Sequence, residues 1–142
     1  MIGAQIEEGR GKRTGRRVIA TEPVMKVEAS VEETASFLGV EGLNIITYVS
    51  HSKPDGSLEG QGEGVFASLQ GDIVTWKGMG VGRFGENGSI HYSGSLSFTT
   101  TAQKLAKLNG MCVVFDWEID AQGNTHSKMW EFGTAAGRTA TA

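Results

Sequence analysis

Apolar and polar residues alternate over most of the chain, and turn residues interrupt the alternation at short intervals. In residues 88–100, the apolar side chains of Ile90, Tyr92, Leu96 and Phe98 fall on one face and the polar side chains on the other. A period of two is typical of a strand that buries one face. The pattern predicts strands over 23–31, 42–51, 58–68, 72–84, 88–100, 111–120 and 125–132, with a further strand near 16–20.

Glycine-containing turns separate these strands and keep the connections short. In the turn at 53–56, Pro54 presets φ and Gly56 accepts a positive φ. Asn87-Gly88 is the dipeptide most typical of a two-residue hairpin loop. Strands joined by tight turns pair in antiparallel order. We therefore predict an all-β fold, a small antiparallel barrel of about seven or eight strands in a meander, with one short helical turn at 102–109.

The chain of 142 residues has a length that fits one domain. We expect that domain to span residues 16–132. Five basic residues gather near the N-terminus, and residues 1–15 are expected to form a flexible basic arm. Residues 133–142 are small and polar, and we expect a disordered tail there.

Composition excludes several classes of function. A net charge of −3 argues against general nucleic-acid binding, which requires a basic surface. Cys112 is the single cysteine, so no internal disulfide can form. No apolar run is long enough for a membrane-spanning helix, and the first 20 residues lack a signal-peptide pattern. We expect a cytoplasmic protein that binds neither nucleic acid nor membrane.

Two apparent motifs do not fit their usual chemistry. Residues 80–85 match the glycine pattern of a dinucleotide-binding loop, but that loop must open a helix, and here it leads into another predicted strand. His51, His91 and His126 lie on separate segments without the spacing of a metal site. The sequence therefore predicts no cofactor and no metal.

The Asn87-Gly88 turn predicts how two neighbouring strands pair. A two-residue loop places Arg83 opposite Tyr92 and Met79 opposite Leu96. This register turns the cationic side chains of Lys77 and Arg83 toward the core, where an unpaired charge is costly. Either they lie at a barrel mouth, or Arg83 anchors an anion or carbonyl beside the Tyr92 hydroxyl. The predicted ligand-binding residues are Lys77, Met79, Val81, Arg83, Tyr92, Leu96 and Phe98.

Glycines alternate in two successive strands, at 60, 62 and 64 and again at 78, 80 and 82. Glycine weakens a strand unless bending or a close approach requires it. One interpretation is strong curvature of the barrel wall. The other is space left open for a ligand, and the pattern is compatible with both.

Several segments resemble a family of short, functionally uncharacterised prokaryotic proteins, over roughly residues 11–132. They are 62–65, 75–84, 105–110, 117–124 and 128–131. As a hairpin plan the chain is also similar, more distantly, to the barrel of allene oxide cyclases and dirigent-type proteins. Those barrels shape a reactive apolar molecule and are usually dimers or trimers, so the resemblance implies a homo-oligomer. No motif transfers their functional residues.

Three functions follow from these patterns. The first is a small-molecule-binding barrel with an apolar interior and a few polar anchors, whose partner is a small apolar molecule. The second is a cofactor-free cyclase or isomerase, with Arg83 and Tyr92 stabilising negative charge and Glu63 as the base. The third is a structural module that oligomerises through a face of glycine and serine.

Overall fold

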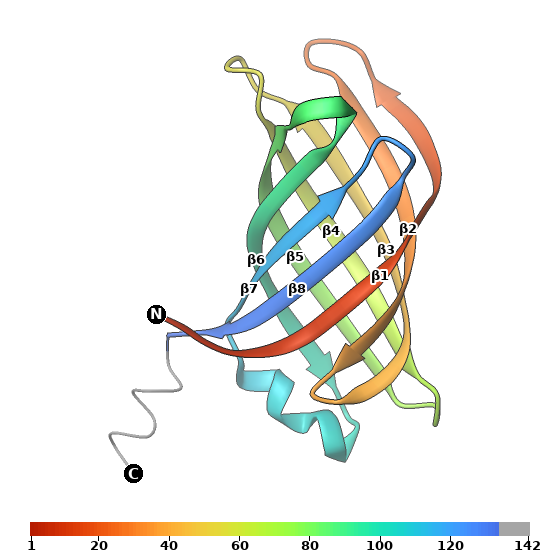
Figure 1. Cartoon of the computed structure of the whole chain (residues 1–142), viewed down its shortest axis with the longest axis vertical. Helices are drawn as coiled ribbons and strands as arrows, with labels where there is room; N and C mark the ends of the chain where they lie inside the picture. The colour runs from red at the N-terminus through yellow and green to blue at the C-terminus, as the bar shows by residue number, and fades with distance from the viewer. Residues whose placement is uncertain (134–142) are drawn as a thin grey trace.

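The computed structural model describes residues 1–133 and forms a closed antiparallel barrel of eight strands in meander order (Figure 1). The strands are β1 (Ile2–Ala20), β2 (Lys26–Phe37), β3 (Val40–Ser52), β4 (Leu58–Ser68), β5 (Ile73–Phe84), β6 (Ile90–Thr100), β7 (Val113–Ile119) and β8 (Asn124–Phe132). Two short helices, η1 (Glu86–Gly88) and η2 (Gln103–Gly110), follow β5 and β6. The predicted fold class is confirmed. The predicted disordered tail lies, apart from Gly133, outside the described residues.

The N-terminal residues are part of the barrel, and the prediction of a flexible arm over residues 1–15 is wrong. β1 pairs with β2 on one side and with β8 on the other, which closes the sheet. Its inward positions include Ile6 and Gly9, while Arg10 and Lys12 are exposed. Because glycines occupy inward positions and cations occupy outward positions, this segment lacks the apolar alternation that predicts a strand, although it forms one.

The helix η2 covers the lower end of the barrel (Figure 1). Leu105 and Leu108 of η2 are fully buried in the core. Below Leu96, β6 has no partner on β7. There the Asn109 side chain accepts a hydrogen bond from the Thr100 N–H (2.8 Å) and donates one to the Thr100 carbonyl (2.9 Å). An amide side chain thus replaces a missing strand at this edge.

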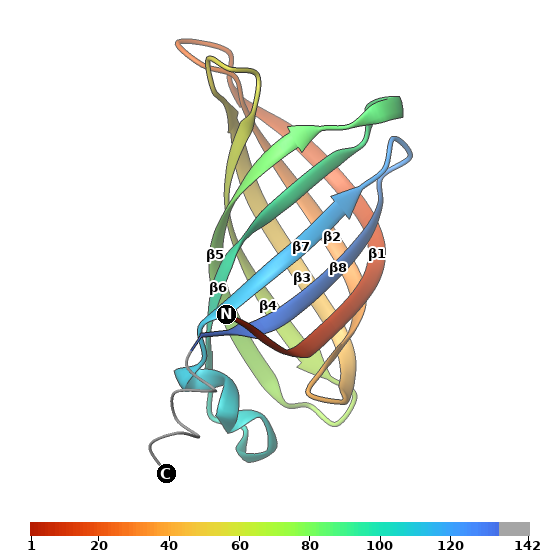
Figure 2. The same cartoon turned by 60° about the vertical axis from the view of Figure 1, so that its left-hand side comes forward.

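At the upper end, the hairpin of β1 and β2 extends beyond the turn that joins β7 and β8 (Figure 2). β1 pairs with β8 only as far as Lys12, whereas it pairs with β2 as far as Ala20. The Arg13 N–H donates a hydrogen bond to the Gly123 carbonyl (2.7 Å), where the two edges separate. Residues 14–20 therefore border an open upper mouth. Among residues 1–133, neither helix has the length and apolar content needed to cross a membrane.

The alternating glycines provide room for large inward side chains on neighbouring strands. Gly64 pairs with Trp76, Gly78 with Leu96, and Gly82 with Tyr92. A Cβ atom at Gly82 would lie 2.6 Å from the Tyr92 ring, and one at Gly64 would overlap the Trp76 indole. A glycine on one strand thus lies opposite a large side chain on the next. Close packing is therefore a third reason for the alternating glycines, beside the curvature and the open space predicted from sequence.

The predicted face of β5 is wrong, because the hairpin loop has three residues rather than two. Phe84 pairs with Ile90, and the Gly85 N–H donates to the Ser89 carbonyl (2.8 Å), which leaves 86–88 as the loop. Gly82, not Arg83, therefore lies opposite Tyr92. A shift of one residue inverts the face of a strand. The side chains turned outward are those of Lys77, Met79, Val81 and Arg83.

The fit of Gly64 against Trp76 leads to a stability prediction. The Trp76 Nε1–H donates to Asn44 Oδ1 (3.0 Å), so the indole cannot move without breaking a buried hydrogen bond. We expect Gly64→Ala to destabilise the fold by roughly 1–3 kcal/mol through overpacking. Gly15→Ala is the matched control, because no atom lies within 4 Å of a Cβ built there. Equal losses in urea unfolding would contradict this packing argument.

Candidate functional site

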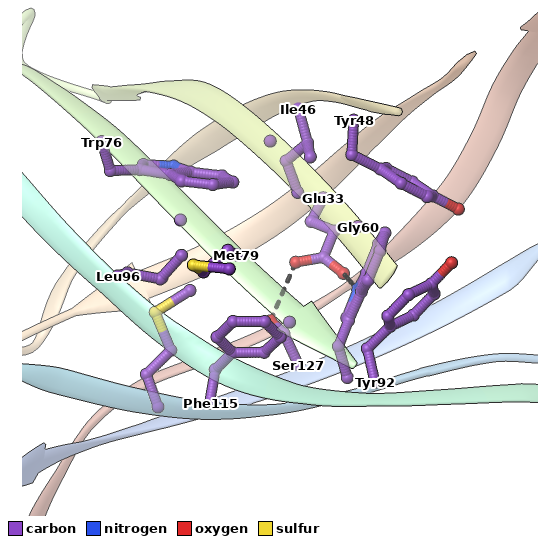
Figure 3. A pocket seen from close by; sticks show the side chains of 15 residues that line it. Glu33, Ile46, Tyr48, Gly60, Trp76, Met79, Tyr92, Leu96, Phe115 and Ser127 are labelled. Carbon is purple, nitrogen blue, oxygen red and sulfur yellow. Dashed lines mark hydrogen bonds between the residues drawn. The ribbon is translucent and has the colours of Figure 1, made fainter. Parts of the chain in front are cut away.

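An interior cavity of about 60 Å³ lies in the middle of the barrel (Figure 3). Large side chains border it on two sides, and the bare glycine wall of β4 and β5 borders it on another. One water molecule takes up roughly 30 Å³ of liquid, and a cavity of about 150 Å³ holds benzene. The space therefore accommodates a body of a few heavy atoms. Its lining includes Ile46, Gly60, Gly62, Trp76, Gly78, Gly80, Leu96, Phe115 and Met129.

Three aromatic side chains lie between this cavity and the upper mouth. The ring centroids of Tyr48 and Trp117 are 5.0 Å apart, those of Tyr48 and Tyr92 5.8 Å, and those of Tyr92 and Trp117 6.0 Å. Burial raises the pKa of both tyrosine hydroxyls above the usual value. Both phenols are therefore protonated near neutral pH, and each can donate a hydrogen bond.

A buried carboxyl group borders the cavity opposite the glycine wall. Glu33 is fully buried and accepts hydrogen bonds from the Trp117 Nε1–H (2.9 Å), the Thr125 hydroxyl (2.7 Å) and the Ser127 hydroxyl (2.8 Å). An indole N–H can only donate, so Glu33 Oε2 must accept there. These three neutral donors replace the water that a carboxylate loses on burial.

A second buried carboxyl, Glu7, joins this network through Ser127. The Ser127 oxygen lies 2.7 Å from Glu7 Oε2 and 2.8 Å from Glu33 Oε1. A hydroxyl has one hydrogen to donate, so one of these contacts must carry a hydrogen from a carboxyl group. Burial raises the pKa of Glu7 to about 8; the Ser127 hydrogen bond opposes this shift, and the charges of Glu33 and Glu8 add to it. The hydrogen therefore belongs to Glu7, which donates to Ser127, which donates to Glu33.

Sequence reasoning missed both carboxyl groups, although one signal was present. Val31, Glu33, Ala35 and Phe37 alternate with more polar positions on β2, and all four are buried. The same alternation that predicts strands elsewhere places Glu33 on the inner face. An acidic residue in register with an apolar row is the signal that could have found it.

The structure separates the predicted site residues into two groups. Tyr92 and Leu96 border the cavity from inside, and Phe98 packs deeper in the core against Phe37, whereas Met79 borders the cavity from its position on the outer face of β5. Lys77, Val81 and Arg83 are exposed on the outer face of β5.

The three residues of the enzymatic hypothesis are not brought together. Glu63 pairs with Lys77 on the outer face of β4 and β5, and Arg83 pairs with His91 on the outer face of β5 and β6. Tyr92 points inward and is buried. Ligand binding and catalysis by the predicted residues stay predictions, but the trio of Arg83, Tyr92 and Glu63 cannot meet one substrate inside the barrel.

The three histidines each pair with one carboxylate. His51 lies 3.3 Å from Glu59, His91 3.0 Å from Asp116, and His126 2.7 Å from Glu8. Within residues 1–133, no group of three or more His, Cys, Asp or Glu side chains is arranged to hold a metal ion.

No family model matches the sequence, and no curated protein matches it. The chain is similar in structure to a protein of unknown function from Clostridium acetobutylicum ATCC 824, with a TM-score of 0.78 and 9% identity, covering 93% of this chain and 98% of that one. It is also similar to a conserved protein of unknown function from Rhodopseudomonas palustris, with a TM-score of 0.76 and 11% identity, covering 93% and 99%.

At these identities the comparisons show a shared fold alone. The chain has the fold of uncharacterised bacterial barrels. The more distant resemblance to allene oxide cyclases and dirigent-type proteins finds no support among these neighbours.

The shared hydrogen of Glu7 predicts a pH dependence of stability. The pKa of Glu7 in the folded chain, about 8, is above the usual glutamate value of 4.5. The stability linked to this group is thus fully present below pH 4.5 and is lost as the pH rises through 8. Between pH 4.5 and 8 we expect the free energy of unfolding to fall by about 1.4 kcal/mol per pH unit from this group alone.

Glu7→Gln removes the ionisation and should flatten this slope, as measured by urea unfolding across the range. Glu63→Gln is the control, because it removes an exposed carboxyl group on the outer face. Parallel stability curves for wild type and Glu7→Gln would contradict the assignment of the hydrogen to Glu7.

Proposed function

We propose that the barrel binds a small, largely apolar molecule in its interior cavity. The observation that carries the proposal is the unfilled volume of about 60 Å³ between Trp76 and Trp117, which is lined mainly by buried apolar side chains and glycines. Apolar pockets with a few placed polar groups are the usual form of small-molecule sites. Glu33 and the two tyrosine hydroxyls are the polar groups at this level.

The glycine wall supports the same proposal. Gly60 and Gly62 border the cavity without side chains, so the backbone of β4 itself forms part of the lining. A ligand can therefore approach the wall more closely than any side chain would allow. The aromatic rings of Tyr48, Tyr92 and Trp117 border the space on the side of the upper mouth.

An enzymatic role is the alternative, and it would have to use different residues from those predicted by sequence. The chain from Glu7 through Ser127 to Glu33 could pass a proton, because each member is hydrogen-bonded to the next. A cyclase or isomerase activity would then depend on Glu33 rather than Glu63.

The oligomeric state stays a prediction. The expected face of glycine and serine is divided between the two sides of the wall: the serines of β6 are exposed on the outer face, whereas Gly78, Gly80 and Gly82 of β5 face the interior. A separate apolar surface lies on the outer faces of β3, β4 and β5, where the exposed side chains of Leu43, Ile45, Val65 and Ile73 lie close together.

Filling the cavity should abolish ligand binding. Ile46 borders the cavity and is buried, whereas its neighbour Ile45 points outward and is 46% exposed. We expect xenon to shift the indole N–H signals of Trp76 and Trp117 in 15N NMR spectra of the wild type and of Ile45→Phe. Ile46→Phe places a ring in the space and should lose both shifts. A wild-type spectrum that does not respond to xenon would refute the cavity proposal.

A further inference from the structure

Two arginines face the inside of the upper mouth. Arg13 pairs with Val31, and Arg16 pairs with Ala29, and both partners are buried residues of the inner face. Residues three apart on a regular strand lie on opposite faces. Here a bulge between Arg13 and Gly15 adds one residue, so both arginines lie on the same face. The irregularity in β1 thus directs two cations toward the entrance of the barrel.

Within residues 1–133, Arg13 and Arg16 differ from Arg10 and Arg17 of the same strand in having no acidic partner. Arg10 lies 3.9 Å from Glu8, and Arg17 lies 3.4 Å from Glu28. Within the described part of the chain, no carboxylate lies within salt-bridge distance of Arg13 or Arg16. The mouth therefore holds two cations whose charges are free to pair with a ligand.

Tyr48 connects this charged mouth to the cavity beneath it. The Tyr48 side chain borders the cavity. Burial and the neighbouring Tyr92 raise the pKa of its hydroxyl, and the positive charges of Arg13 and Arg16 act in the opposite direction. Ser50 lies two residues farther along β3, toward the mouth, and its hydroxyl lies beside that of Tyr92. Cations and hydroxyl donors thus surround the entrance to an apolar space.

The buried carboxyl groups of Glu7 and Glu33 give the interior a polarity. Among residues 1–133, the buried side chains of ionisable acids and bases are those of Glu7, Glu33 and Glu131, so no buried cation lies at that depth. An anion is attracted to the arginines at the mouth, whereas an apolar group is accepted by the cavity. A ligand that satisfies both ends has its charge at the mouth and its carbon body inside.

We propose that Arg13 and Arg16 bind the carboxylate of a small amphipathic acid whose apolar body, of a few carbon atoms, occupies the cavity. A guanidinium group suits this role because its parallel N–H donors match the two oxygens of a carboxylate. The inference rests on the proposed function, since it requires the cavity to accept a ligand. It adds the chemical class of that ligand and the residues that select it.

Three compounds of one size test the charge preference: butanoate, butanamide and butylammonium. Each is titrated at neutral pH into the 15N-labelled full chain, and the Trp117 indole N–H signal reports on occupancy of the cavity. We expect butanoate to bind about tenfold more tightly than butanamide, because only the carboxylate forms charged hydrogen bonds with the arginines. Added salt should weaken the binding of butanoate and leave that of butanamide unchanged.

The double variant Arg13→Gln/Arg16→Gln should lose the preference for butanoate and retain its affinity for butanamide. Lys12→Gln is the matched control, because it removes a cation from the outer face of the same strand and should leave the preference intact. If the double variant does not fold, the salt dependence of the wild type still decides the question.

The possible results separate this inference from the proposed function. Equal affinity for butanoate and butanamide, independent of salt, overturns the anion site and leaves the cavity in place. Tighter binding of butylammonium also overturns it. A response to xenon without a response to any of the three compounds overturns the anion site alone, whereas loss of the xenon response overturns both proposals.

Discussion

The interior of an eight-stranded barrel has room for one layer of side chains from each wall, and this limit governs the rest of the structure. That space cannot hold the side chains of Trp76, Tyr92 and Leu96 if the residues opposite them on neighbouring strands are also large. Each instead lies against a glycine directly opposite on the neighbouring strand. The two rows of glycine are therefore a packing requirement, and the cavity lies at the level where large side chains above and below do not meet.

The same limit explains why the buried polar groups form one connected network. Two carboxyl groups inside a narrow barrel are costly unless both are hydrogen-bonded and one of them is neutral. Ser127 meets this condition by joining Glu7 to Glu33 across three strands. The result is a pair of hydrogen-bonded carboxyl groups beside the cavity, with the cations of Arg13 and Arg16 at the mouth. An interior with these two ends favours a ligand that is charged at one end only.

Regular alternation predicted much of this from the sequence. The inward row of Ile90, Tyr92, Leu96 and Phe98, the meander order and the helical turn near 103–110 all follow from period and turn chemistry. The inward face of β5 could not be predicted in this way. A loop of two residues and a loop of three residues both fit Asn87-Gly88, and they turn opposite faces of β5 inward. A difference of one residue in the length of this loop decides whether Arg83 or Gly82 faces the interior.

Other parts of the site depend on features that composition conceals. The inward row of β1 mixes Ile6, Glu7, Gly9 and Arg13, so residues 2–15 have no apolar period although they close the barrel. The bulge that turns Arg16 inward leaves no mark in a single sequence. Glu33 was accessible to sequence reasoning, because it occupies an inward position between Val31 and Ala35. Its hydrogen-bond donors come from β7 and β8, which only the closed barrel brings to it.

The most direct measurement is a crystal structure of the full chain in which the interior side chains are resolved. The account predicts an open volume between Trp76 and Trp117, bordered by Glu33 and by the glycines of β4 and β5, with Lys77 and Arg83 outside the barrel. An interior filled by side chains at that level would contradict it. So would a β5 strand turned by one residue, with Lys77 and Arg83 inside and its glycines facing solvent.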